Sequence, residues 1–178
     1  DRSYPPQGGS LNDYVKWARA CPTVAVARAW AFAWTDLPVG YVDVYFTVDD
    51  GDGTESVPDA GDLSAMDAYM QPLATGGTAL TIKAPATDSL DPAITLHVLT
   101  GYALADVKAA IEASLAAFLM TIEMSAGSYT IRNSQIRDAL NVPGVDYYVL
   151  TSLNGGSPTA DVTIAGYTVA TVGTIAWS

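Results

Sequence analysis

The sequence has few of the residues on which catalysis, metal binding and membrane insertion usually depend. Its 178 residues include one cysteine, Cys21, and one histidine, His97. A single cysteine excludes an internal disulfide and any metal site built from several cysteines. The longest stretch without charge, residues 162–178, is interrupted by Gly166 and Gly173. It is therefore predicted to form strands and not a transmembrane helix.

Basic residues are also scarce: there are 8, against 19 acidic residues, which gives a net charge of −11. A surface of this sign repels phosphate groups, so we expect neither nucleic acid nor an anionic membrane as a partner. Only 15% of the residues are charged, whereas 49% are apolar. A chain of this length cannot bury all of that apolar surface, which favours contact with other protein subunits. The alternative is a monomer whose surface is rich in Thr, Ser and Gly.

In the first half, Ser10 and Asp13 form a capping box that predicts a helix from Leu11 to about Cys21. A strand follows at residues 24–34. Its bulky residues share one parity and predict one bulky face: Val24, Val26, Trp30, Phe32 and Trp34. Residues 35–40 have turn composition and lead into a strand at 41–48, so the two strands are predicted to form a hairpin. A helix that begins near Pro58, with Asp59 and Asp62 in its first turn, and a strand at residues 78–83 complete this half.

Residues 84–92 are rich in proline and small polar residues and mark the predicted boundary between two modules. The second module is predicted to contain a strand at 93–100, a helix at 103–124, a strand at 129–131 and a helix at 134–140, followed by strands at 145–153, 160–164 and 172–177. The apolar stripe of the long helix is predicted to comprise Leu104, Val107, Ile111, Leu115, Phe118 and Ile122. Asn154-Gly155 is a hairpin signal, so residues 160–164 should pair antiparallel with 145–153.

These elements predict an α+β fold of two small α/β sandwich modules, residues 1–85 and 86–178. In each module we expect a mostly antiparallel sheet covered by helices.

Two places in the chain could carry chemistry. His97 has no Gly-x-Ser-x-Gly motif to serve as a partner nucleophile, so a structural or surface role is predicted for it. The acidic loop, residues 49–55, offers several carboxylates to a calcium ion. However, counting from Asp50, the position that requires glycine in the helix-loop-helix calcium motif is Glu55. We therefore predict no catalytic residue, cofactor site or metal site. The alternative is a calcium-dependent extracellular binding module that uses residues 49–55.

Four stretches, in this order, resemble the baseplate J-like family of contractile phage tails, such as the Mu-like ones. They are Pro5-Pro6-Gln7-Gly8-Gly9-Ser10 with the following Tyr14-Val15-Lys16-Trp17-Ala18 helix, Val57-Pro58-Asp59-Ala60, the Ala-rich helix of residues 104–119, and Ser134-Gln135-Ile136-Arg137-Asp138-Ala139-Leu140. Members of that family are usually longer at the amino end, so the chain resembles their carboxy-terminal part.

This resemblance implies a non-enzymatic wedge subunit of the tail baseplate, which is part of the virion after assembly in the host cytoplasm. Its expected partners are other wedge proteins and a second copy of itself, with no small-molecule substrate. The predicted interface residues are Pro5, Pro6, Gly8, Gly9, Trp30 and Trp34.

Overall fold

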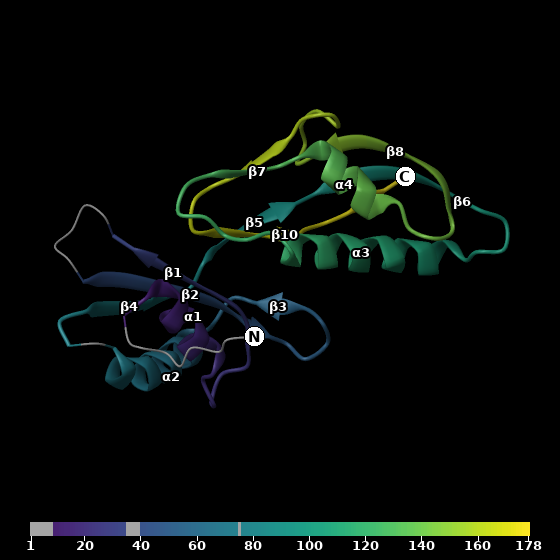
Figure 1. Ribbon diagram of the computed structural model, residues 1–178. Helices are drawn as coiled ribbons and strands as arrows, with labels where there is room; N and C mark the ends of the chain where they lie inside the picture. The colour runs from purple at the N-terminus through teal and green to yellow at the C-terminus, as the bar shows by residue number, and fades with distance from the viewer. Residues whose placement is uncertain (1–8, 35–39, 75) are drawn as a thin grey trace, which may run out of the picture. The chain divides into compact units, whose positions relative to one another are not determined.

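The computed structural model describes residues 9–34, 40–74 and 76–178, and it divides into two compact units, residues 1–85 and 86–178 (Figure 1). The α+β class is confirmed, since both units combine helices with sheets.

The first unit is built on one four-stranded sheet. Its strands are β1 (Val26–Ala33), β2 (Tyr41–Asp49), β3 (Glu55–Ser56) and β4 (Ala79–Lys83). The central strand, β2, pairs antiparallel with β1, as the hairpin prediction requires, and also antiparallel with β3. On the edge away from β1 it pairs with β4 in parallel, because the chain crosses over through a helix between β3 and β4.

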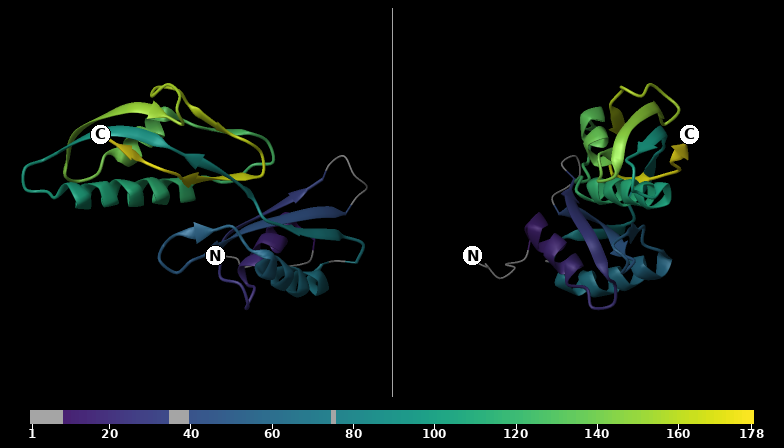
Figure 2. Two further views of the ribbon diagram at one scale, coloured as in Figure 1. Left: turned by 180° about the vertical axis from the view of Figure 1, so that it is seen from behind. Right: turned by 90° about the vertical axis from the view of Figure 1, so that its right-hand side faces the viewer.

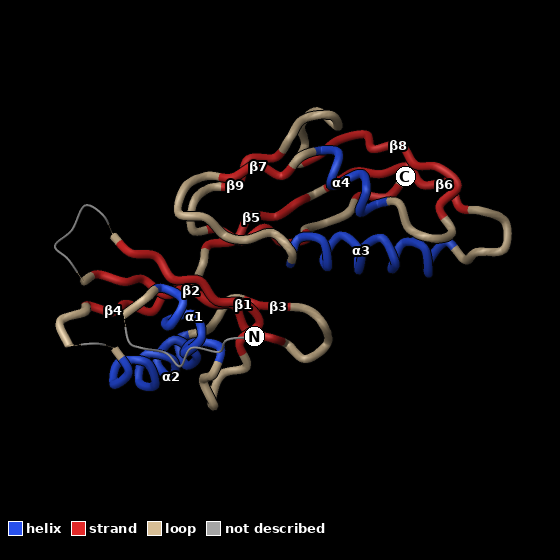
Figure 3. Tube along the Cα trace, viewed as in Figure 1, coloured by secondary structure: helices blue, strands red, loops and turns tan. Residues whose placement is uncertain are grey.

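Both helices of this unit, α1 (Leu11–Arg19) and α2 (Ala60–Met70), cover the same face of the sheet, and the 3-10 turn η1 (Gln71–Leu73) follows α2 (Figure 3). Each helix begins at a complete capping box, formed by Ser10 with Asp13 and by Asp59 with Asp62. Helix and sheet residues together form a buried core: Tyr14, Ala18, Met66, Met70, Ala29, Val42, Val44, Phe46 and Leu80.

The predicted bulky face of β1 is wrong in one respect. Val26 packs against the core under the helices, whereas Trp30 lies on the opposite face of the sheet. The reason is a bulge between Val26 and Arg28, which inserts one extra residue and reverses the alternation.

In the second unit the strands form three small sheets, where the sequence predicted one. Its elements are β5 (Ala86–Leu90), β6 (Pro92–Val98), α3 (Leu104–Met120), β7 (Tyr129–Ile131), α4 (Asn133–Leu140), β8 (Val145–Leu153), β9 (Val162–Ile164), β10 (Thr168–Val172) and β11 (Ala176–Trp177). β5 pairs with β10 and β11 with β6, both in parallel, while β6–β8 and β7–β9 are antiparallel. The helices α3 and α4 lie beside these strands and line one core with them (Figure 2): Ile94, Ile111, Leu115, Ile136, Leu140, Leu150 and Ile164.

The predicted pairing of residues 160–164 with β8 is wrong, because β9 pairs with β7. The turn at Asn154 and Gly155 does form, with φ of 51° and 70°. Beyond this turn, residues 158–161 bind the start of α4 instead of pairing with β8. The Asn133 backbone N–H donates to the Asp161 carboxylate (2.8 Å), and the Asn133 side-chain amide donates to the Pro158 carbonyl (2.9 Å).

The predicted last strand, 172–177, is divided between β10 and β11 because Asp91 binds the turn between them. Its carboxylate accepts hydrogen bonds from the Thr174 N–H (2.7 Å) and the Ser89 hydroxyl (2.8 Å). Asp91 also exchanges hydrogen bonds with Asn154, through its own N–H (2.7 Å) and its carbonyl (2.9 Å). This one residue therefore holds together three turns that are distant in sequence.

Candidate protein-contact surfaces

The sheet face of the first unit that points away from α1 and α2 combines aromatic rings with ion pairs, and we call it the aromatic face. It is defined by Arg28, Trp30, Phe32, Trp34, Asp43, Tyr45, Thr47, Glu55 and Lys83. It lies on this side because β2 alternates: Val42, Val44 and Phe46 face the helices, so the residues between them face the other way.

Two carboxylates organise the aromatic face. Asp43 accepts from the indole N–H of Trp34 (2.7 Å) and forms an ion pair with Lys83 (2.6 Å). Glu55 forms the second ion pair, with Arg28. Both carboxylates are buried, and opposite charge and hydrogen bonds compensate the cost of removing them from water.

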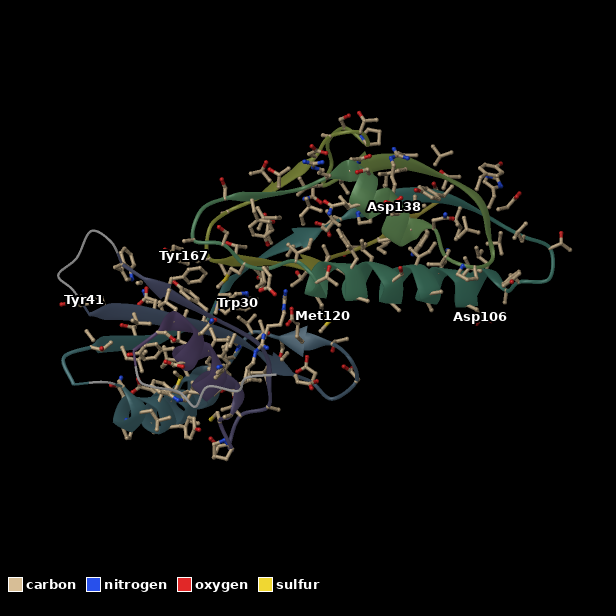
Figure 4. All side chains as sticks on the ribbon, in the orientation of Figure 1. Trp30, Tyr41, Asp106, Met120, Asp138 and Tyr167 are labelled. Carbon is tan, nitrogen blue, oxygen red and sulfur yellow. The ribbon has the colours of Figure 1, made fainter. Side chains whose placement is uncertain are left out.

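The two predicted tryptophans lie on this same face but differ in exposure. The Trp30 side chain is 7% exposed, and the Arg28 guanidinium lies 4.9 Å from its ring centroid. Trp34 is 42% exposed, with the Lys83 ammonium 5.5 Å from its ring. Figure 4 shows the Trp30 side chain on β1. Trp34 is therefore the residue of the pair with surface available to a neighbour.

Of the other predicted interface residues, Pro5, Pro6 and Gly8 lie outside the described residues. Gly9 is exposed, with a φ of 123°, and immediately precedes Ser10, the N-cap of α1. The interface role of all six residues stays a prediction.

The second unit also exposes a set of large apolar side chains that the sequence did not predict. Five large apolar side chains there are 44–53% exposed: Leu99, Tyr102, Leu104, Tyr147 and Val149. We call this set the β8 patch. The prediction that Leu104 is buried is wrong, because the first turn of α3 extends past the core and the buried stripe begins at Val107.

Contacts between neighbouring segments position three members of the β8 patch, Leu99, Tyr102 and Tyr147. His97 on β6 is exposed and stacks on Tyr147 of β8, with ring centroids 4.0 Å apart. The Leu99 N–H donates to the Gly144 carbonyl (2.9 Å), and the Tyr102 ring lies directly against Gly144. The residue pattern contained one signal for this surface: residues 145–149 read Val-Asp-Tyr-Tyr-Val, with apolar residues on both faces of the strand.

Beside the β8 patch is an open concavity of about 340 Å³. It is lined by Arg137, Asp138, Asn141, Val145, Asp146, Tyr147 and Tyr148. The Tyr148 hydroxyl donates to the Arg137 carbonyl (3.0 Å), which fixes α4 against β8. Burial raises the pKa of Tyr148 above its ordinary value of 10.0.

In the acidic loop, the carboxylates bind the loop's own polar groups. Asp49 accepts from the Gly51 N–H (2.8 Å), and Asp52 accepts from the hydroxyl (2.5 Å) and N–H (3.0 Å) of Thr54. These hydrogen bonds, the hydroxyl first, lower the pKa of Asp52 below its ordinary value. Among residues 9–34, 40–74 and 76–178, no group of three or more His, Cys, Asp or Glu side chains is arranged to hold a metal ion. In the same part of the chain, no helix is long and apolar enough to cross a bilayer.

Comparison with known proteins matches each half of the chain to a protein-family model. Residues 6–91 match the model of the "Baseplate J-like central domain", and residues 90–178 match that of the "Baseplate J-like protein C-terminal domain". The chain belongs to the baseplate J-like family. The resemblance seen in the sequence is thereby confirmed, and the family's central and C-terminal domain models match the chain one after the other.

Two relatives of this baseplate J-like chain are similar over nearly its whole length. One is the "Putative protein JayE" of Escherichia coli strain K12, which is 28% identical over 97% of the chain and 60% of the relative. The other is the "Mu-like prophage FluMu protein gp47" of Haemophilus influenzae, 30% identical over 98% of the chain and 47% of the relative. The chain thus spans roughly half the length of these relatives.

The fold also occurs in a solved assembly. A chain of the cryo-EM structure of the anti-feeding prophage baseplate, 6-fold symmetrised, superposes with a TM-score of 0.61 at 14% identity. The match covers 98% of the baseplate J-like chain and 39% of the solved chain. At this identity the likeness shows a common fold.

Proposed function

We propose that this chain is a structural part of the wedge of a contractile-tail baseplate and that it acts by packing against other wedge proteins and a second copy of itself. The observation that carries the proposal is the match of residues 6–91 and 90–178 to two consecutive baseplate J-like domains. The exposed aromatic and aliphatic residues at Trp34 and in the β8 patch support it, because such groups on a soluble surface mark protein contacts.

In this account the chain works through interface energetics. Subunits repeated around a tail axis form a closed ring, and their contacts must hold during assembly and rearrange when the tail contracts. The proposed function requires no catalytic residue, cofactor, nucleic acid or membrane. Its place is the tail baseplate of the virion, after assembly in the host cytoplasm.

We further propose that residues 1–85 and 86–178 are separate domains that fold independently. Each unit has its own buried core, and only Ala84 and Pro85 lie between β4 and β5. Expression of residues 86–178 alone should give the same amide chemical shifts for core residues such as Ile111 and Leu150 as the whole chain. Collapsed, poorly dispersed spectra would contradict separate folding.

Deletion of the gene from a phage or prophage that carries it tests the structural role. The proposal predicts tails that lack an assembled baseplate and a loss of infectious particles, both restored when the gene is supplied in trans. A vector without the gene is the control. Normal tails and normal infectivity after deletion would overturn the proposal.

A further inference from the structure

We propose that the β8 patch and the adjacent concavity form a docking site for a positively charged segment, flanked by apolar residues, on a different protein. This inference rests on the proposed function, since it assigns one surface of the second unit to one kind of partner. It depends on three features of this surface: exposed apolar residues, a net negative charge and a concavity lined by aromatic rings.

The apolar part of the surface has the composition of an interface centre. Half of the ten large apolar residues that are exposed in the described chain fall within residues 99–104 and 147–149. Tyr147 is held in place by its stack on His97, and Tyr102 by its contact with Gly144, so both rings are presented at little cost in conformational entropy. Tyrosines of this kind contribute more to binding than most interface residues.

The charged part of the surface has a net negative charge, and its carboxylates form no ion pair among the described residues. Asp138 and Asp146 line the concavity. Asp106 lies in the first turn of α3, two residues after exposed Leu104; Figure 4 labels Asp106 and Asp138. None of these three carboxylates forms an ion pair with another described residue. Arg137 also lines the concavity and keeps its positive charge, because its partners there, the Asn133 side chain (2.7 Å) and the Pro158 carbonyl (3.1 Å), are neutral. It offsets one of the two carboxylates and leaves the lining with a net negative charge.

A lysine or arginine side chain fits this concavity. It would find two carboxylates, from Asp138 and Asp146, against one guanidinium, from Arg137. The amide of Asn141 and the rings of Tyr147 and Tyr148 complete the polar and aromatic lining. Carboxylates bind such cations by charge-assisted hydrogen bonds, and tyrosine rings attract them through their faces. Apolar residues on either side of that cation would then cover the β8 patch.

A second copy of this chain is poorly suited to the same surface. It carries the same 19 acidic and 8 basic residues, and a two-fold contact through this site would place carboxylates against carboxylates. Several of its basic side chains also have internal partners: Arg28 and Lys83 are ion-paired, and Lys108 lies 5.1 Å from the ring of Trp177. The charge of the site therefore favours a basic partner with another sequence.

A titration of the isotopically labelled chain with two synthetic decapeptides tests the site directly. Both peptides alternate Leu and Tyr with a charged residue, which is Arg in one and Glu in the other. We expect the Arg peptide to shift amide resonances within residues 97–104 and 138–149. We expect it to bind at least about tenfold more tightly than the Glu peptide, because close pairs of opposite charge contribute that much to affinity.

Two charge-reversal variants provide the control. Asp146→Lys should remove the difference in affinity between the two peptides, while Glu112→Lys, at an exposed carboxylate on α3, should preserve it. Unchanged spectra outside the site show that both variants fold. Equal binding of the two peptides, or shifts elsewhere, would overturn the inference.

Cross-linking in assembled tail particles provides the second measurement. With Tyr147 replaced by the photoreactive p-benzoylphenylalanine, we expect a cross-link to a Lys- or Arg-containing peptide of another protein. A cross-link to a second copy of this chain would contradict the docking inference and leave the proposed function standing. The absence of any cross-link in particles that contain the chain would have the same meaning. If an immunoblot shows that the particles do not contain this chain, the proposed function is contradicted. The peptide titration would still test whether the docking site binds a positively charged segment.

Discussion

Arg28 on β1 and Glu55 on β3 form an ion pair across Thr47 on the strand between them. The Arg28 Nε donates to Glu55 (2.9 Å), and a second guanidinium nitrogen donates to the other carboxylate oxygen. The Thr47 hydroxyl accepts from the Arg28 backbone N–H (3.2 Å) and donates to Glu55 (2.7 Å). The pair exists because the bulge before Arg28 turns its side chain to the aromatic face. It holds the two-residue strand β3, and with it the end of the acidic loop, against the sheet.

Loss of either partner of this ion pair should be costly. The two side chains are 9% and 8% exposed, so Arg28→Ala or Glu55→Ala leaves a buried charge without its partner. We expect each variant to lose about 3–5 kcal/mol of unfolding free energy, measured by urea denaturation. The double variant Arg28→Met with Glu55→Leu should recover much of that loss. Single variants that lose less than about 1 kcal/mol, as exposed pairs do, would contradict this account.

The Tyr14 hydroxyl is buried and has no hydrogen-bond partner among the residues that the structure describes. Tyr14→Phe removes this unpaired group and keeps the ring, which packs edge-on against Trp17. The unfolding free energy should stay unchanged or rise by about 1 kcal/mol. Tyr148→Phe is the matched control and should lose about 1 kcal/mol, because its hydroxyl is bonded to the Arg137 carbonyl. Equal losses in the two variants would count against an unpaired Tyr14 hydroxyl.

Gly144 supports the β8 patch and cannot accept a side chain. Its φ is +95°, and a Cβ atom there would lie 2.6 Å from the Tyr102 ring and 2.9 Å from Val107. Gly144→Ala should cost about 2–5 kcal/mol, from backbone strain and overpacking combined. Gly101→Ala isolates the strain, since Gly101 has a φ of +100° and nothing within 4 Å of the added atom. It should cost only about 1–2 kcal/mol. The same loss in both variants would mean that the steric contact is unimportant.

The stability of the second unit should fall at alkaline pH through Tyr148. Burial raises its pKa above 10.0, so the folded chain keeps the phenol proton at a pH where the unfolded chain releases it. The resulting stabilisation is complete below pH 10 and is lost as the pH rises through the folded value. The stability advantage of the wild type over Tyr148→Phe should therefore shrink above pH 10 in urea titrations. An advantage independent of pH would contradict the raised pKa.

Calcium should have no effect on the acidic loop, whose carboxylates bind Gly51, Thr54 and Ser56. About 5 mM calcium exceeds the Kd of the weakest extracellular calcium modules, about 10⁻³ M, so a real site would be filled. We expect the melting temperature to change by less than about 1 °C, which is smaller than the shift produced by about 1 kcal/mol of added unfolding free energy. A rise of several degrees that Asp50→Ala with Asp52→Ala abolishes would establish the calcium-binding alternative.

The sequence predicted the elements whose causes are local. Ser10 and Asp13 locate the start of α1 because a capping box needs only residues three apart. The start of α2 was predicted near Pro58, with Asp59 in the first turn; in the structure Asp59 is the N-cap, in a capping box with Asp62, and the helix begins at Ala60. The hairpin of β1 and β2 was predictable because its cause is local as well. The parallel pairing of residues 86–90 with 168–172 was not, since polar Ala-Thr-Asp-Ser-Leu gains its strand conformation only from a distant partner.

The contact surfaces were harder to predict, because exposure depends on packing between elements. Trp30 and Trp34 were placed on one face correctly by their parity, yet only the structure separates the buried ring from the exposed one. Tyr147 and Val149 lie on β8, where Leu150 is buried. The apolar residues on both faces of this strand are a signal for an apolar surface, but they do not show which of the two faces is uncovered.

Cryo-EM of purified tail particles in which this chain carries a compact tag is the most direct test of its proposed role. The account predicts tag density in the baseplate, in equivalent copies related by the symmetry of the tail axis. Particles that are complete without the chain, or tag density confined to the head or the tail tube, would contradict it.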